Sequence, residues 1–402
     1  MKSITRLLDR LSKRASSHAP RQPSATFDAD RITDTIERAL TAAGLDPRSG
    51  PAGDATATVE RTLRQAGFAT ARPDAPTATS AEAAARGETL VEPPRSPAPV
   101  LPGTFTSHSY SNAAGTRAYK LYVPATSADV AQAPRPLLVM LHGCTQSPDD
   151  FAAGTRMNAL ADQFGFLVAY PAQTARDNGS KCWNWFRAED QRNGRGEPSL
   201  IAGIVAAIAA DHGIDPHRVF VAGLSAGAAM AVILGQTYPD VFAAIGAHSG
   251  LPYGAAHDMP SAFAAMQGGS STATAKRTAA PASSRDSPSV PTIVFHGDAD
   301  RTVNERNGLD IVQDATASGT PATPLLEHAT AGTVEGGRAF TRTVFTDAAS
   351  RPRAEYWRIH GAGHAWSGGS ASGSYTDPKG PDASAEMVRF FLQQPAPIAG
   401  AA

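Results

Sequence analysis

From residue 118 onward, short apolar runs alternate with longer stretches in which apolar residues recur at helical spacing. Runs such as Pro136–Leu141 and Pro291–Phe295 are continuously apolar, which is typical of parallel strands that are buried on both faces. Stretches such as Ser199–His212 place apolar residues three and four positions apart, which predicts helices. Because strand and helix alternate with short connections, the pattern predicts an α/β fold with a mostly parallel central sheet and helices on both faces.

The pattern also gives approximate bounds for the expected elements. The expected strands are Ala118–Val123, Pro136–Leu141, Phe166–Tyr170, Arg218–Ala222, Phe242–Ala247, Pro291–Phe295 and Glu355–His360. The expected helices are Asp150–Phe164, Ser199–His212, Ala226–Tyr238, Glu305–Thr316 and Ala383–Gln393. Gly268–Val290 interrupts this order with a stretch rich in Ser, Thr, Ala and Pro, and we expect a flexible insertion there.

The first hundred residues have a different character. The segments 35–45 and 58–68 resemble one another, and each places its apolar residues on one stripe and stops at a glycine, which predicts short amphipathic helices. These are either marginal surface helices or a small docking element. Arg72–Pro102 has the Ala-, Pro- and Thr-rich composition of a linker. We therefore expect a partly disordered N-terminal region over 1–103, one domain over 104–394 and a tail over 395–402.

Composition and charge exclude several classes of protein. Hydrophobic residues make up 42% of the 402 residues, which is enough for a sizeable buried core. The 36 basic and 37 acidic side chains nearly balance, so the chain offers no basic surface of the kind that binds nucleic acid. No apolar run reaches the roughly eighteen residues of a membrane-spanning helix, so we expect no membrane span.

The first twenty residues hold apolar side chains at helical spacing, but Arg6, Asp9 and Arg10 interrupt them. A secretory signal needs an unbroken apolar stretch of about seven to fifteen residues. We therefore expect no export signal. The segment forms either a short basic amphipathic helix or a frayed terminus.

A candidate nucleophile lies in the sequence Gly223-Leu224-Ser225-Ala226-Gly227, which fits the pattern G-x-S-x-G. An expected strand precedes it and an expected helix of small residues follows it. A serine on such a sharp strand-to-helix turn is held in a strained, exposed conformation, and the flanking glycines remove side chains that would clash. The alternative is an ordinary glycine-rich turn of an α/β sheet, which leaves the next motifs unexplained.

The loop after the strand Pro136–Leu141 is a candidate oxyanion hole. Acyl transfer needs two backbone N–H groups that already point at the oxygen on which negative charge develops. One donor is expected from Ala226, which follows the nucleophile, and the other from this earlier loop. Cys144 is the preferred residue there, with Thr145 as the alternative.

The acid is expected after the nucleophile, at the end of the strand Pro291–Phe295. Asp298 and Asp300 compete for this role. We prefer Asp300, which lies further into the loop, and expect Asp298 to fix the turn through its own backbone. His296 beside these aspartates could suggest a metal cluster, but no further ligand set accompanies it, and we expect no metal.

The base is expected to be a histidine beyond Asp300. His364 lies in a glycine-rich loop just past the last long strand, where an imidazole can reach Ser225. His360 lies within that expected strand, and His328 belongs to no comparable motif. His364 is therefore the predicted base, and Asp300 would hold its tautomer and stabilise the imidazolium.

Five motifs now occur in a fixed order: HGC-T-Q, CWNWF, GLSAGAAM, HGDADRTV and GAGHAW. In these motifs, over about residues 104–394, the chain resembles the polyhydroxybutyrate depolymerase family of esterases, with a catalytic domain of the type that carries its serine motif in mid-domain. Feruloyl and acetylxylan esterases share this outline. The resemblance implies an α/β-hydrolase fold without a cofactor, a triad of Ser225, Asp300 and His364, and Cys144 as an oxyanion residue.

The resemblance implies a serine esterase that hydrolyses poly(3-hydroxybutyrate) or its oligomers through an acyl-enzyme. A feruloyl or acetylxylan esterase is the alternative, and a non-catalytic protein that binds the surface of storage granules is an alternative of another class. Extracellular members of the family usually carry a signal peptide and a later substrate-binding domain. The chain is more similar to the intracellular branch, so we expect a cytoplasmic, granule-associated protein, with an extracellular location as the alternative.

The motif Cys182-Trp183-Asn184-Trp185-Phe186 is rich in aromatic residues. Because a polyester of short hydroxyacids is largely apolar, aromatic walls suit it, and Trp183, Trp185 and Trp366 are the expected substrate contacts. The alternative for one of the first two tryptophans is a place in the core. Cys144 and Cys182 either form a bridge between the oxyanion loop and this aromatic loop or stay free, and a bridge would be unusual in a cytosolic protein.

Overall fold

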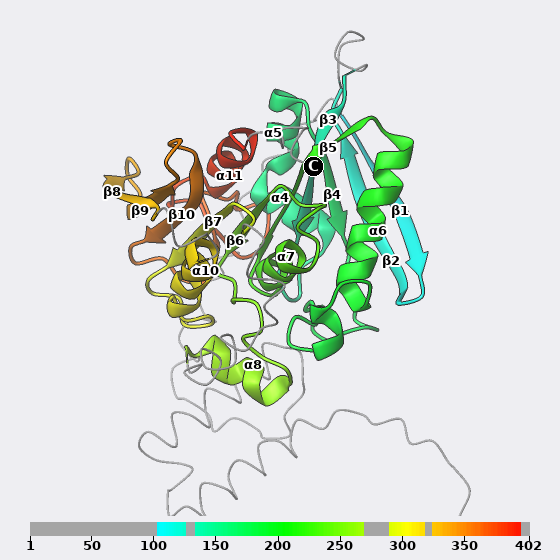
Figure 1. Cartoon of the computed structure of the whole chain (residues 1–402), viewed down its shortest axis with the longest axis horizontal. Coiled ribbons are helices and arrows are strands. Elements are labelled where there is room, and N and C mark those ends of the chain that lie inside the picture. Colours follow the sequence, from blue (N-terminus) through cyan, green and yellow to red (C-terminus); the bar gives the residue numbers. More distant parts are fainter. Residues whose placement is uncertain (1–102, 126–132, 269–288, 318–323, 395–402) are drawn as a thin grey trace, which may run out of the picture. The chain divides into compact units, whose positions relative to one another are not determined.

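The computed structural model of the chain describes residues 103–125, 133–268, 289–317 and 324–394 (Figure 1). All of them belong to the compact unit Pro93–Ala402. The N-terminal segments, nearly all of the expected insertion and the expected tail lie outside these ranges. None of the helices within them combines the length and the apolar character that a membrane crossing requires.

The core of the domain is a ten-stranded sheet with the order β1-β2-β4-β3-β5-β6-β7-β10-β9-β8. Its strands are β1 (Thr104–Asn112), β2 (Gly115–Val123), β3 (Arg135–Leu141), β4 (Leu167–Pro171), β5 (Ile214–Leu224), β6 (Ala244–His248), β7 (Thr292–Gly297), β8 (Leu326–Thr333), β9 (Ala339–Thr346) and β10 (Pro352–Ile359). In the central part of the sheet, β4-β3-β5-β6-β7-β10, neighbouring strands pair in parallel. Antiparallel strands extend both edges. The predicted mostly parallel sheet is confirmed.

Helices cover both faces of the sheet (Figure 1). They are α4 (Pro148–Thr155), α5 (Met157–Phe164), α6 (Gly196–Asp211), α7 (Ala226–Thr237), α8 (Met259–Met266), α10 (Arg306–Ala317) and α11 (Ala383–Leu392), with a short 3₁₀ helix η1 (Ala188–Gln191) before α6. A separate two-stranded sheet joins β11 (Trp366–Ser367) to β12 (Thr376–Asp377).

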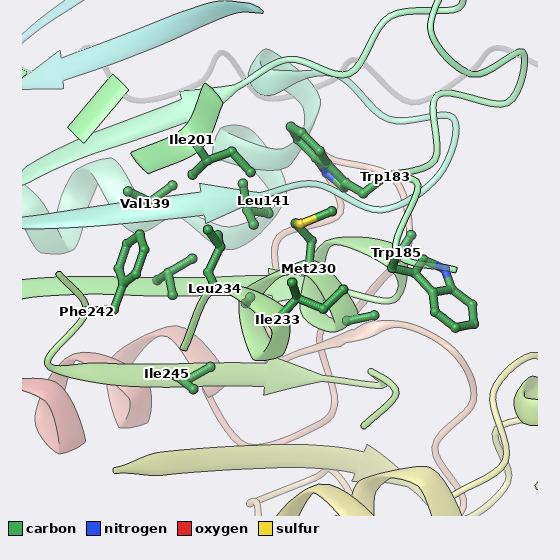
Figure 2. Close-up of a cluster of buried hydrophobic side chains, with 14 of the residues drawn as sticks. Val139, Leu141, Trp183, Trp185, Ile201, Met230, Ile233, Leu234, Phe242 and Ile245 are labelled. Atoms are coloured by element: carbon green, nitrogen blue, oxygen red, sulfur yellow. The ribbon is translucent and has the colours of Figure 1, made fainter. Parts of the chain in front are cut away.

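The alternation of side chains along β3 divides the core into two layers. Leu137, Val139 and Leu141 pack into a cluster with α6 and α7, of which Figure 2 shows Ile201, Met230 and their neighbours. Leu138 and Met140 point the other way, into a cluster with α4, α5 and α11. Because β3 is buried on both faces, its sequence is a continuous apolar run.

The structure differs from expectation in several elements. The expected helix Asp150–Phe164 is divided at Arg156, whose left-handed backbone (φ 55°) separates α4 from α5. The Arg156 guanidinium donates to Asp382 at 2.7 Å and to Gly368 O, which favours this irregular position. The strands expected from the sequence do not include the hairpin β8–β9, and His328 lies within β8.

Candidate active site

Ser225 lies on a sharp turn between β5 and α7. Its backbone angles are φ 57° and ψ −120°, a strained conformation for a residue other than glycine. Its N–H donates to His248 O at 2.9 Å, and its carbonyl accepts the first helical bond from the Ala229 N–H. The Ser225 side chain makes no capping bond to α7. The turn therefore holds the hydroxyl at the end of the sheet without using it structurally.

The two glycines of the motif are required by close backbone approach. A Cβ on Gly227 would lie 2.1 Å from Leu141 O, and one on Gly223 would lie 2.4 Å from the Gly227 carbonyl carbon. Any side chain at these positions would push the turn away from the end of β3. The glycines thus let the first turn of α7 lie directly against the strand that leads into the expected oxyanion loop.

His364 and Asp300 form a buried hydrogen-bonded pair. The His364 Nδ1 is 2.7 Å from Asp300 Oδ2, and their side chains are 13% and 0% exposed. Burial alone would raise the pKa of Asp300, but the bond from His364, the histidine charge and the Val303 N–H together hold it below its ordinary value. Asp300 is therefore a carboxylate at neutral pH, and His364 keeps Nε2 as its proton acceptor.

The other expected competitor, Asp298, pairs with a different histidine. Its Oδ2 is 2.9 Å from His360 Nδ1, and its Oδ1 accepts the Gly361 N–H. The turn after β7 is instead fixed by Asp300, whose Oδ1 accepts the N–H groups of Thr302 and Val303. The expectation that Asp298 fixes its own turn was wrong, because its side chain faces the end of β10.

The backbone N–H groups of the loop after β3 differ in whether they already have an acceptor. The Thr145 N–H donates to Ser180 O at 2.7 Å, and the Gly143 N–H donates to Gln146 Oε1 at 2.9 Å. Within the described ranges, the N–H of Cys144 donates to no protein acceptor. Of the two residues considered from the sequence, Cys144 is thus the one whose N–H is available to a ligand.

Several bonds hold this loop in place. Cys144 and Cys182 form a disulfide, so the structure contains the bridged form of the two alternatives. His142 accepts the Gln173 N–H at Nε2 and lies 2.7 Å from Gly143 O through Nδ1, which indicates that the ring proton is on Nδ1. Burial lowers the pKa of His142 to about 4, so the ring stays neutral. It braces the loop.

The expected aromatic contacts are mostly buried. Trp183 is 0% exposed and donates from its indole to His142 O, and Trp185 belongs to the same cluster (Figure 2). Trp366 is 1% exposed, donates to Ser384 Oγ and stacks on His248. Trp183 and Trp366 are therefore core residues rather than walls of a cleft. Their neighbours in the sequence lie at the site, but their rings point into the core.

Two residues that the sequence reasoning missed lie at this end of the sheet. Tyr375 is 48% exposed, and its hydroxyl is 3.3 Å from Thr145 Oγ1, next to Cys144. His248 ends β6 and accepts the Ser225 N–H through its carbonyl. A polar residue at the carboxyl end of a buried strand was the available signal for His248. Tyr375 carried no comparable signal, because its loop is irregular.

The three side chains that could suggest a metal cluster each have a hydrogen-bond partner within the protein. His296 Nε2 is 2.8 Å from Val303 O, and Asp298 and Asp300 bond to different histidines. No group of three or more His, Cys, Asp or Glu side chains in the described ranges is arranged to hold a metal ion.

Residues 117–316 match the family model described as Esterase PHB depolymerase. Poly(3-hydroxyalkanoate) depolymerase C of Paucimonas lemoignei is 36% identical over 57% of this chain and 54% of its own length. Poly(3-hydroxybutyrate) depolymerase of Ralstonia pickettii is 30% identical over 62% and 51%. Feruloyl esterase B of Neurospora crassa is 36% identical over 36% and 47%. The matched region thus spans about half the length of each of these proteins.

Among solved structures, the acetyl xylan esterase from Aspergillus awamori superposes with a TM-score of 0.52 at 19% identity, over 72% of this chain and 99% of that one. This likeness concerns the fold, and with the sheet described above it confirms the predicted α/β-hydrolase architecture. Through the domain over residues 117–316, the chain belongs to the Esterase PHB depolymerase family.

Proposed function

We propose that the chain is a serine esterase that hydrolyses ester bonds of poly(3-hydroxybutyrate) or its oligomers through an acyl-enzyme. The observation that carries the proposal is the buried pair of His364 and Asp300, whose Nδ1 and Oδ2 are 2.7 Å apart. Ser225 sits on its strained turn at the carboxyl end of the same parallel sheet. A hydroxyl, an imidazole and a carboxylate at one sheet edge are the components of a serine hydrolase.

In the acylation step, Ser225 Oγ attacks the ester carbonyl carbon while His364 Nε2 takes the hydroxyl proton. The Asp300 carboxylate stabilises the imidazolium through Nδ1. The tetrahedral intermediate then collapses, its bond to the leaving alkoxide breaks, and His364 delivers the proton to that oxygen. The released product is an alcohol, which in a polyester is the hydroxyl end of the remaining chain.

The negative charge on the carbonyl oxygen is the part of this step that the backbone can stabilise. The N–H groups of Ala226, at the N-terminus of α7, and of Cys144 are the proposed donors. Deacylation repeats the sequence with water as nucleophile: His364 takes a proton from water, the acyl–oxygen bond to Ser225 breaks, and Ser225 regains its proton as the hydroxyacid leaves.

The exposed ring of Tyr375 is the proposed aromatic contact for substrate in place of Trp183 and Trp366. It lies beside Thr145, on the rim of the loop that supplies Cys144. An apolar stretch of polyester backbone can cover such a ring, which offers an apolar face and a polar hydroxyl. The two depolymerase relatives support a polyester as substrate.

A carbohydrate esterase is the second candidate. The similarity to feruloyl esterase B of Neurospora crassa supports it, because that protein is 36% identical over 36% of this chain. The same triad would then remove an acyl group from a polysaccharide. The two candidates differ in the leaving alcohol and in what the rim of the site must accommodate.

The purified chain should be assayed on native and denatured granules of poly(3-hydroxybutyrate), on p-nitrophenyl butyrate and on feruloylated and acetylated xylan, with Ser225→Ala as control. We expect release of 3-hydroxybutyrate from polymer that Ser225→Ala abolishes. Faster turnover of the xylan esters would transfer the proposal to the second candidate. A folded wild-type protein that is inert toward every ester would favour a non-catalytic granule-binding protein instead.

Of the two expected locations, the disulfide supports the extracellular one, because disulfides persist in oxidising compartments. Association with storage granules in the cytoplasm is the alternative proposal. Alkylation of the protein taken from its own cells distinguishes them: two unmodified cysteines in secreted material fit the first, and two alkylated cysteines in granule extracts fit the second.

A further inference from the structure

His248 is a fully buried histidine whose polar groups are all in use. It is the last residue of β6, and its ring is stacked on Trp366 with centroids 5.3 Å apart and on Phe295 with centroids 5.8 Å apart. A polar ring that is buried among aromatic side chains must find hydrogen-bond partners for its nitrogen atoms.

The backbone of His248 holds the nucleophile. Strands β5 and β6 run in parallel, with Leu224 opposite His248. The next bond in that direction joins the Ser225 N–H to His248 O at 2.9 Å. The backbone of His248 therefore ties the strained turn at Ser225 to β6, which leaves the His248 ring to make other contacts.

The side chain of His248 holds the loop that carries His364. Its Nε2 accepts the N–H of Ser367 at 3.0 Å, three residues after His364. Its Nδ1 is 3.2 Å from Ser249 Oγ. Since Nε2 is an acceptor, the ring proton lies on Nδ1 and donates to Ser249, which fixes the tautomer that the bond to Ser367 requires. The stacked Trp366 holds the same loop from the ring face.

We infer that His248 is a positioning residue that sets the separation between Ser225 and His364, by binding the turn of the first with its backbone and the loop of the second with its imidazole. The inference rests on the proposed function. The reacting groups of an enzyme must lie in near-attack geometry, and a displacement of about 1 Å can cost about a hundredfold in rate. A residue that joins both parts is suited to hold that geometry.

Two amides of similar polarity but different length test the inference. In His248→Gln the side-chain oxygen can reach the position of Nε2 and accept the Ser367 N–H, whereas in His248→Asn it reaches only the position of Nδ1. We expect His248→Asn to lower kcat on p-nitrophenyl butyrate by about 10- to 100-fold with KM changed less than about threefold, and His248→Gln to retain most of kcat.

The rate at which a fluorophosphonate modifies Ser225 is the second readout, because it reports activation of the hydroxyl without substrate binding or product release. It should fall with kcat in His248→Asn and recover in His248→Gln. Equal rates in both variants, whether both match wild type or both fall with the folded fraction in circular dichroism, would overturn the inference. Failure of the wild-type protein to react at Ser225 would reject the proposed function itself.

Discussion

Asp298 and Asp300 are two residues apart, and each carboxylate is bonded to the Nδ1 of a histidine from the segment after β10. The two pairs differ in burial. Asp300 is 0% exposed in its side chain, and His364 is 13% exposed, whereas Asp298 and His360 are 20% and 37% exposed. His360 Nε2 also lies 3.0 Å from Thr341 Oγ1, so both ring nitrogens are occupied. Only His364 combines a shielded carboxylate with a free proton acceptor.

We therefore expect Asp300→Asn to lower kcat on p-nitrophenyl butyrate by about a thousandfold or more, because the amide favours the wrong tautomer of His364. The matched variant Asp298→Asn changes the same atoms two residues away. It should keep kcat within about threefold and lose stability only modestly, as expected for a partly exposed pair. Steady-state kinetics of both variants decide the assignment, and a larger loss in Asp298→Asn than in Asp300→Asn would reverse it.

The prediction for Tyr375 concerns substrate binding rather than the chemical step. Tyr375→Ala should raise KM for oligomers of 3-hydroxybutyrate by about tenfold, which corresponds to ~1.4 kcal/mol of lost binding, because the apolar ring is removed. Tyr375→Phe keeps the ring and should stay within about threefold of wild type. Acetyl esters, which are too short to cover the ring, serve as the control substrate. Equal KM values for oligomers in all three proteins would remove Tyr375 from the substrate site.

At the scale of elements, the disulfide connects two loops that no secondary structure joins. Cys144 and Cys182 are 38 residues apart, a separation at which a bridge contributes about 3–4 kcal/mol in the chain-entropy model. Replacing both by alanine should lower the melting temperature by roughly 10 °C. Because the proposed oxyanion donor is the backbone N–H of residue 144, kcat at 20 °C should fall less than in Asp300→Asn. Calorimetry showing an unchanged melting temperature would contradict this expectation.

The strands that the sequence predicts most clearly are those buried on both faces. Runs such as Pro136–Leu141 have no solvent side, so the apolar signal is continuous and unambiguous. Strand β8 could not be found in this way, because LEHATAGT is exposed along most of its length and has no apolar face. The division of the helix at Arg156 was hidden for another reason: a left-handed residue other than glycine depends on tertiary contacts.

In the candidate site, too, part of the structure could be predicted from the sequence and part could not. The order of the motifs was sufficient to predict that Asp300 and His364 lie together, because the carboxyl ends of parallel strands meet at one edge of the sheet. The direction of a side chain within a loop was not predictable. Trp366 is two residues from His364, but its indole turns inward to Ser384. The contact between Tyr375 and Thr145 joins residues that are 230 positions apart, and no sequence pattern predicts it.

At the scale of the whole molecule, burial of neutral histidines makes folding sensitive to acid. Burial lowers the pKa of His142 to about 4 and that of His248 to about 3, from an ordinary value of 6.5. Nearby His296 and His364 charges lower the second further, and Asp300 opposes them. Between these values and 6.5 the unfolded chain binds more protons than the folded one. The stability that these groups supply is therefore complete above pH 6.5 and is lost as the pH falls.

The buried carboxyl of Glu197 acts in the opposite direction. Burial and the charge of Asp190 raise the pKa of Glu197 to about 7 from 4.5, against the Asn184 N–H and the Arg117 guanidinium. Here the folded chain binds the extra proton, so this contribution is complete below pH 4.5 and is lost as the pH rises toward 7. The change in the pKa of Glu197 on folding is smaller than the combined changes in the pKa values of His142 and His248. Acid should therefore destabilise the protein on balance.

We expect the melting temperature to fall steadily from pH 6.5 to pH 4, by an amount that corresponds to several kcal/mol, since each pKa difference of one is worth about 1.4 kcal/mol. His248→Gln removes a titrating group from the core, so its melting temperature should depend less on pH over this range. Glu197→Gln removes the opposing contribution, so its decline should be steeper than that of wild type. Scanning calorimetry of the three proteins between pH 4 and pH 8 measures how steeply each melting temperature depends on pH. Parallel curves for all three would mean that these buried groups do not control the acid limb.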